Sequence, residues 1–108
     1  FTTSGPGAAN GLGGLADAWF DGFPIMGICG NVPTNEMKGF SGIRQNGFQE
    51  MKLVSMTRNI TKYSVTANTS KGFPDIVSRA YNMALLGRKG GVIIDFPLDI
   101  QQADITCW

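Results

Sequence analysis

Two short apolar runs constrain the fold of this chain more than any other feature of its sequence. Residues 25–29 (IMGIC) and 92–96 (VIIDF) are almost continuously apolar, as strands buried on both faces of a parallel sheet usually are. A third run, residues 61–65, alternates well enough to form a further strand. Because helical patterns lie between these runs, we expect an α/β fold, a three-layer sandwich around a mostly parallel central sheet.

The first helical pattern follows directly on a bend. Residues 1–3 have the character of a strand end, residues 4–7 (SGPG) form a tight turn, and apolar residues then recur at helical spacing from 8 to 19. A glycine inside a helix costs about 1 kcal/mol relative to Ala, so we expect close backbone packing to offset that cost. The glycines concerned are Gly11, Gly13 and Gly14.

The remaining elements are a helix over residues 73–84 and a shorter helical stretch near residues 49–56. Ser70 is a candidate cap for the longer helix, and Gly87 is placed to end it. Residues 30–47 are polar and rich in glycine, with no sustained period. A loop of that length is usually functional or disordered.

Size and composition exclude several classes of protein. At 108 residues the chain is one domain at most, and its charged fraction of 16% is low, so we expect a partner domain or subunit to cover part of the surface. The net charge of +1 comes from scattered basic residues, which argues against nucleic acid. No apolar run approaches the length of a membrane span and no leader opens the chain, so we expect no membrane partner and a cytoplasmic location.

The titratable residues also limit the chemistry. The sequence has no histidine, which excludes Ser-His-Asp and Cys-His nucleophiles and histidine-rich zinc sites. Cys29 and Cys107 have no metal-ligand spacing, and we expect both to be reduced. If the chain takes part in catalysis, a cofactor should therefore carry the chemistry.

The bend over residues 4–7 is the first candidate binding site. It places two glycines and a proline between a strand end and a helix start, where free backbone N–H groups and missing side chains let a ligand approach. The same residues suit a plain strand-to-helix turn, and both interpretations stay open. No Gly-Lys-Ser/Thr follows, which excludes a Walker phosphate loop. In such a sheet ligands bind beyond the carboxyl ends of the strands.

Several blocks in order along the chain resemble the acetolactate synthase type of thiamine-diphosphate-dependent enzymes. The bend opens the longest block, TSGPGAAN at residues 3–10, which is similar to the family's TSGPGATN and is followed at 14–18 by GLADA. Further along, GNVP at 30–33 resembles GQVP, GFQE at 47–50 resembles AFQE, TRNITK at 57–62 resembles TRSITK, and GRKGGVIIDFPLD at 87–99 resembles GRPGPVLVDVPKD. Together these blocks cover the whole chain.

The resemblance implies a cofactor and a place for this chain in a larger enzyme. In that family two domains from different subunits hold thiamine diphosphate, one gripping the diphosphate through Mg²⁺ and the other binding the aminopyrimidine. Residues 1–108 are similar to the second, as a partial pyrimidine-binding domain whose upstream part, with the catalytic glutamate, is missing. The implied partners are the diphosphate-binding domain and further subunits, in a homodimer or homotetramer. Mg²⁺ would be bound outside this chain, and no metal site is expected within it.

The resemblance also assigns roles to residues. The family's proline and asparagine near the pyrimidine ring correspond to Pro6 and Asn10, and its active-site Phe-Gln pair to Phe48 and Gln49. Arg88 corresponds to an arginine that contacts FAD in acetolactate synthases. From the residues alone, Gln49 also suits a solvated loop amide, and Arg88 also suits a cation on the last carbonyls of a helix. The candidate site residues are therefore Gly5, Pro6, Gly7, Asn10, Phe48, Gln49 and Arg88.

The activity implied is decarboxylation of pyruvate and its joining to a second 2-oxo acid, with this chain inactive by itself. Alternatives are a glyoxylate carboligase, a sulfoacetaldehyde acetyltransferase, an oxalyl-CoA decarboxylase, or a non-catalytic α/β module that serves subunit contact. Two departures from the family pattern bear on the choice: the stretch from Pro33 to Gln49 is longer, and GRKGG replaces GRPGP at 87–91. Glu50 and Lys62 are interpreted as structural, the first as a residue that caps or pairs locally and the second as partial cover for a strand edge.

Overall fold

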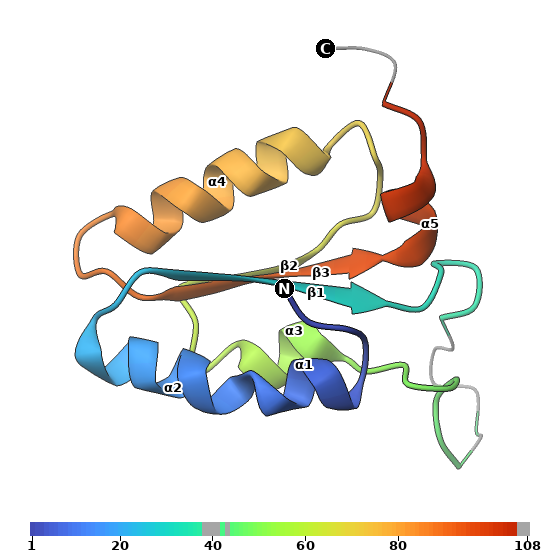
Figure 1. Ribbon diagram of the computed structural model, residues 1–108, viewed down its shortest axis with the longest axis horizontal. Helices are drawn as coiled ribbons and strands as arrows, with labels where there is room; N and C mark the ends of the chain where they lie inside the picture. Colours follow the sequence, from blue (N-terminus) through green and yellow to red (C-terminus); the bar gives the residue numbers. More distant parts are fainter. Residues whose placement is uncertain (38–41, 43, 106–108) are drawn as a thin grey trace.

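The computed structural model describes residues 1–37, 42 and 44–105. Its centre is a parallel three-stranded sheet in the order β1-β3-β2, with bounds β1 Ile25–Asn31, β2 Tyr63–Thr66 and β3 Gly91–Pro97 (Figure 1). Thr2 adds a parallel bridge to Cys29 on the outer side of β1. The predicted strand at residues 1–3 is therefore present as a single bridge.

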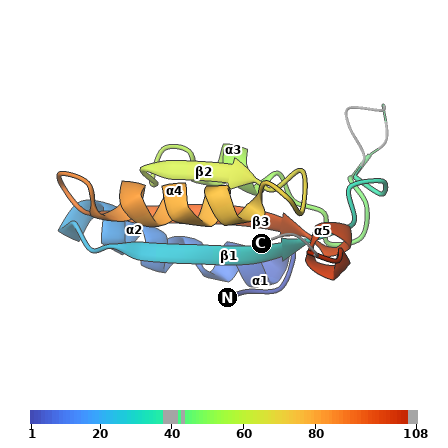
Figure 2. The same ribbon diagram turned by 90° about the horizontal axis from the view of Figure 1, so that it is seen from above.

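Helices cover both faces of the sheet, as Figures 1 and 2 show. On one face lie α1 (Pro6–Asn10), α2 (Leu12–Asp21) and α3 (Leu53–Thr57). The long helix α4 (Phe73–Leu85) covers the other face, and the short α5 (Leu98–Gln102) follows β3 at the carboxyl edge of the sheet. The predicted three-layer α/β fold is confirmed.

The central strand β3 builds both halves of the core. Because side chains of a strand alternate between faces, Ile93 packs toward the first group of helices while Val92 and Ile94 pack toward α4. Burying each of these side chains stabilises the fold by roughly 2 kcal/mol. The buried residues around them are Ala8, Leu15, Cys29 and Leu53 on one face and Ala80 and Ala84 on the other.

Three predictions about the first βαβ unit are wrong. The apolar run of β1 is not buried on both faces, because Met26 and Ile28 are only partly buried on the α4 side of the sheet and Ile25 is 41% exposed. Gly13 and Gly14 do not pack against another backbone, since a Cβ added at either would meet nothing within 4 Å. The single predicted helix is also divided into α1 and α2 at Gly11.

The second βαβ unit agrees more closely, with one correction at the start of α4. Ser70 is not a side-chain cap; its backbone carbonyl accepts from Phe73 N at 3.2 Å, and the hydroxyl of Thr69 accepts from Gly72 N at 3.1 Å. The helix ends at Leu85, before Gly87, which has a positive φ of 61°. The α5 helix was not predicted, because a five-residue helix is too short to show a period.

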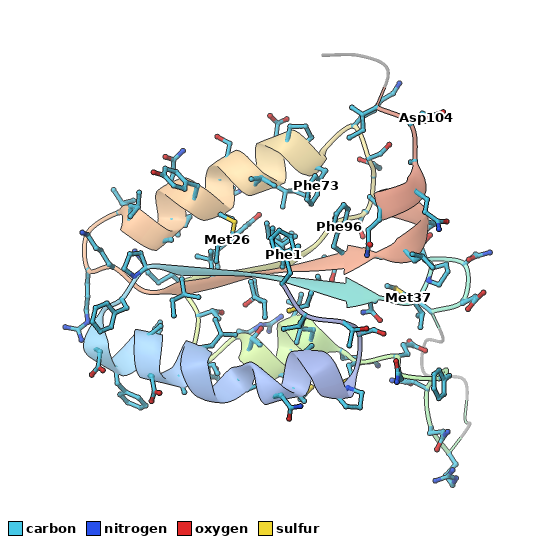
Figure 3. The ribbon with its side chains drawn as sticks, viewed as in Figure 1. Phe1, Met26, Met37, Phe73, Phe96 and Asp104 are labelled. Carbon is cyan, nitrogen blue, oxygen red and sulfur yellow. The ribbon has the colours of Figure 1, made fainter. Side chains whose placement is uncertain are left out.

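An apolar groove remains open beside α4. Phe73 of α4 stacks on Phe96 of β3 with ring centroids 4.0 Å apart, and Figure 3 shows both rings on the α4 side of the sheet together with Met26. The groove has a volume of about 660 Å³ and is lined by Met26, Phe73, Pro74, Val77, Ser78, Tyr81 and Ile105.

In the part of the chain that the structure describes, no helix is long and apolar enough to cross a membrane.

Candidate functional site

The bend at residues 4–7 lies at the carboxyl edge of the sheet and leads directly into α1. Thr2 N donates to Ile28 O and Gly30 N donates to Thr2 O, both at 3.0 Å, which fixes the incoming chain beside β1. Gly5 is the N-cap of α1 with φ 59°, a left-handed conformation that strongly favours glycine, and Pro6 takes the first helical position. The local sequence therefore explains the bend without a ligand.

Gly5 is covered by the segment that carries Gln49. A Cβ added at Gly5 would lie 2.8 Å from Gln49 O and 2.9 Å from Gln49 Cβ, which leaves no room for any side chain. At Gly7 an added Cβ would lie 2.4 Å from the Cγ2 atom of Thr3. Gly5 is thus required by a backbone contact inside the chain, whereas Gly7 meets only a side-chain methyl, and contact of either glycine with a cofactor stays a prediction.

Gln49 has an unusual backbone. Its φ of 56° is the only positive value at a non-glycine residue among those described, a conformation that costs roughly 1–2 kcal/mol for an L-residue. It lies in a turn in which Glu50 N donates to Gly47 O at 3.1 Å. The Oε2 atom of Glu50 accepts from Gly47 N at 2.8 Å, so the predicted local cap by Glu50 is confirmed. Such strain persists only where the surroundings hold it.

The side chains around this contact face solvent. Ser4 Oγ donates to Gln49 Oε1 at 3.4 Å, a long bond that ties the amide loosely to the bend. Phe48 is 84% exposed, and Pro6 and Asn10 are exposed as well. The structure therefore places Gln49 against Gly5, whereas Pro6, Asn10 and Phe48 are exposed on the segments that carry those two residues.

A buried polar pair lies beneath this surface, at the ends of β1 and β3. Asn31 Nδ2 donates to Asp95 Oδ1 at 2.9 Å, and Thr66 Oγ1 donates to Asp95 Oδ2 at 2.9 Å. The side chains of Asn31 and Asp95 are 7% and 4% exposed. Burial raises the pKa of the Asp95 carboxyl, and the hydrogen bonds from Asn31 and Thr66 partly oppose that shift.

Two further features lie at the same edge of the sheet, a hydrogen-bonded carboxylate and a cavity. Asp99, at the start of α5, accepts from Thr34 N at 3.0 Å and from Thr34 Oγ1 at 2.5 Å, bonds that lower the pKa of its carboxyl. A cavity of about 400 Å³ opens between the strand ends. It is lined by Phe1, Thr2, Thr3, Ser4, Ile28, Gly30, Asn31, Phe96, Leu98 and Gln101.

Arg88 lies at the opposite edge of the sheet, before β3 begins, and the structure does not bring it to the bend. Its Nη2 donates to Phe20 O, in the last turn of α2, at 2.6 Å. Lys62 donates to Leu86 O at the end of α4, so its interpretation as structural agrees with the contact. A cavity of about 360 Å³ there is lined by Trp19, Phe20, Lys62, Arg88 and Lys89.

Comparison with known protein families gives one match for this sequence. Residues 1–56, which contain the bend and the Phe48-Gln49 turn, match the family described as thiamine pyrophosphate enzyme, N-terminal TPP binding domain. The chain belongs to this family.

The match to similar proteins extends beyond residue 56 and covers nearly the whole chain. Acetolactate synthase 2, chloroplastic, of Nicotiana tabacum is 44% identical over 93% of this chain, and acetolactate synthase, chloroplastic, of Arabidopsis thaliana is 42% identical over 93%. The acetolactate synthase large subunit of Lactococcus lactis is 39% identical over 96%. The chain spans 14% of the length of the two plant proteins and 17% of the Lactococcus protein.

The exposed residues at the bend fit the aminopyrimidine of the family's cofactor. Pro6 and Phe48 offer apolar surface for a flat ring, while the amides of Asn10 and Gln49 can donate and accept hydrogen bonds, as a ring with an amino group requires. No group of three or more His, Cys, Asp or Glu residues within the described ranges could hold a metal ion.

Sequence reasoning did not identify Asn31 and Asp95 as part of the site. An aspartate within the apolar run of β3 was the available signal, because a buried carboxylate needs partners. The partner could not be read from the sequence, since it lies 64 positions away. Cys29 is free and buried, and burial raises the pKa of its thiol, whereas Cys107 lies outside the described residues.

Proposed function

We propose that this chain is the aminopyrimidine-binding part of an acetolactate synthase-like enzyme, which decarboxylates pyruvate and joins the product to a second 2-oxo acid. The single observation that carries the proposal is the packing of the Gln49 backbone on Gly5, which holds an amide beside the predicted cofactor surface. The names of the relatives support the choice of activity.

In this proposal each residue at the bend has a physical task. When bound, thiamine diphosphate supplies the carbanion chemistry. Pro6 and Asn10 bind one side of the aminopyrimidine and fix its orientation. Gln49 donates a hydrogen bond to the carbonyl of the 2-oxo acid and does not titrate, so its action is independent of pH. The exposed ring of Phe48 excludes water from the substrate once a partner domain closes over it.

The proposal includes partners and further cofactors. A diphosphate-binding domain would bring Mg²⁺ to the bend, within a homodimer or homotetramer. Large apolar side chains exposed on this chain, such as Phe20 and Phe23 at 72% and 61%, are suited to such contacts. FAD would contact Arg88 at the opposite edge of the sheet. A cytoplasmic location is part of the proposal, although several relatives are named chloroplastic, and cell fractionation would test it.

The choice of substrate rests on the loop after β1. The stretch from Pro33 to Gln49 is longer than in typical acetolactate synthases, and its start is tied to α5 through Thr34 and Asp99. This departure keeps a glyoxylate carboligase, a sulfoacetaldehyde acetyltransferase and an oxalyl-CoA decarboxylase as second candidates. Turnover measured with pyruvate, glyoxylate, sulfoacetaldehyde and oxalyl-CoA would rank them.

The decisive experiment uses the full-length polypeptide that carries this sequence. Calorimetry with thiamine diphosphate and Mg²⁺ should show binding, and pyruvate should be turned over. Gln49→Ala should lower kcat/KM about 10²-fold, as loss of a hydrogen-bond donor in an active site often does. The matched control is Gln102→Ala, which removes an exposed glutamine from α5 and should leave turnover unchanged. If no cofactor binds, the chain is instead the non-catalytic subunit-contact module.

A further inference from the structure

Asn31 connects the central strand to the segment that carries Gln49. Its Nδ2 atom donates two hydrogen bonds, to Asp95 Oδ1 at 2.9 Å and to Met51 O at 3.1 Å. Its Oδ1 atom accepts from Val32 N at 2.9 Å. The amide of Asn31 is therefore fully engaged, and one of its bonds ends two residues after Gln49.

Asp95 holds Asn31 in that orientation. It lies in β3, paired in register with Cys29 of β1 and Thr66 of β2, so its backbone is fixed from both sides. Its two carboxylate oxygens accept from Asn31 and from Thr66, which leaves the Asn31 amide one orientation that satisfies every bond. Both side chains are buried, and water cannot easily replace either partner.

The segment after Asn31 needs such an anchor. Gln49 has a left-handed φ of 56°, and its backbone presses on Gly5. A strained residue keeps its conformation only if the chain is held on both sides of it. The turn from Gly47 to Glu50 holds one side, and the bond from Asn31 to Met51 O holds the other.

We propose that Asn31 and Asp95 are positioning residues, which fix the Phe48-Gln49 turn over the bend so that the amide of Gln49 meets the carbonyl of a 2-oxo acid substrate. The inference rests on the proposed function for the identity of the substrate. It goes beyond that function by assigning the placement of Gln49 to the buried pair of Asn31 and Asp95.

A reciprocal exchange separates positioning from simple stabilisation. In the double variant Asn31→Asp with Asp95→Asn, the introduced amide in β3 can donate to the introduced carboxylate in β1 and still accept from Thr66 Oγ1. The carboxylate at position 31 also still accepts from Val32 N. Only one bond cannot be restored, because a carboxylate has no proton to donate to Met51 O.

The exchange is made in the full-length protein and read in two ways. Amide hydrogen exchange over residues 47–52 should become about three- to tenfold faster, the effect of losing one hydrogen bond, while β1 and β3 keep their protection. For turnover of pyruvate, kcat should fall about tenfold, and Gln49→Ala should cost less in the exchanged background than in the original one. The matched control is Asn82→Asp on the exposed side of α4, which should change neither measurement.

The outcomes distinguish the two proposals. Unchanged hydrogen exchange at 47–52 together with unchanged kcat in the double variant would overturn the positioning role and leave a pair that only joins strands. If the double variant does not fold, Asn31→Ser replaces it. A hydroxyl has one proton, so at least one of the bonds to Asp95 and Met51 O is lost, and hydrogen exchange over 47–52 compared with that of β1 and β3 shows which. If the unsubstituted protein neither binds thiamine diphosphate nor turns over a 2-oxo acid, the proposed function fails, and the exchange rates alone decide the role of Asn31.

Discussion

The two edges of the sheet differ in how the chain is held there. At the amino edge, Lys62 and Arg88 donate to carbonyls in the last turns of α4 and α2, an ordinary way to satisfy helix ends. At the carboxyl edge, two residues with positive φ press against each other above a buried carboxylate. The first arrangement satisfies carbonyl groups at helix ends, whereas the second maintains a strained backbone and a buried carboxylate.

The difference marks the carboxyl edge as the part of the described chain that carries an unfavourable backbone conformation and a buried carboxylate. Strain and a buried carboxylate both oppose folding, so they persist where something other than stability requires them. Gln49 and Asp95 carry these costs, and the match to the thiamine pyrophosphate enzyme family contains the first of them. The contacts at the amino edge carry no such cost. Substitutions at the two edges should therefore have effects of different size and sign.

The largest effect is expected from Gly5→Ala. The added Cβ would meet Gln49 O at 2.8 Å, and φ 59° is unfavourable for Ala, so the substitution should cost about 2–4 kcal/mol of stability. Because the turn above it must move, affinity for thiamine diphosphate should fall by more than about tenfold. Urea unfolding and calorimetry on the full-length protein measure the two effects.

Gly13→Ala provides the matched control for that prediction. A Cβ at this position meets nothing within 4 Å and lies inside α2, so the substitution should stabilise the protein by about 0.5–1 kcal/mol. If Gly5→Ala and Gly13→Ala lost the same stability, glycine would be needed equally at both positions. The expected difference between the crowded bend and the open helix would then be wrong.

Gln49→Gly should have opposite effects on stability and activity. Glycine adopts φ 56° without penalty, so stability should rise by up to about 1 kcal/mol even though the side chain is lost. Turnover should fall as in Gln49→Ala, because both variants lack the amide. Thermal unfolding and steady-state kinetics on the same preparations provide the comparison. A loss of stability equal to that of Gln49→Ala would show that the backbone at this residue is not strained.

The sequence predicted the fold better than the contacts at the site. The apolar runs of β1 and β3 and the period of α4 are local signals, and each predicted element is present with shifted ends. The positive φ of Gln49 and the bond from Asn31 to Asp95 depend on how distant segments meet, which no local pattern records. The close backbone packing predicted at Gly13 and Gly14 is absent, because a glycine in a helix permits a close neighbour but does not show that one is there.

Arg88→Ala tests the independence of the amino edge. Loss of the bond to Phe20 O should cost about 0.5 kcal/mol, since the guanidinium is exposed and its carbonyl partner can turn to water. Affinity for thiamine diphosphate should stay unchanged, while the flavin content measured by absorbance should fall if FAD contacts Arg88 as proposed. Lys89→Ala, beside it in the same cavity, is the control. A change in thiamine diphosphate affinity would show that the edges are coupled.

The smallest effect is expected from Asp99→Asn, at the carboxyl edge but outside the strained pair. The bonds from Thr34 lower the pKa of the Asp99 carboxyl below its ordinary value of 3.8. A lowered pKa stabilises the folded protein above pH 3.8, and that contribution disappears as the pH falls through the folded-state value. Asp99→Asn should therefore unfold at a slightly lower temperature at pH 7, with the difference from the unsubstituted protein shrinking only below pH 3.8. If the difference already vanishes near neutral pH, the charge of Asp99 does not hold the loop after β1, and another group must do so.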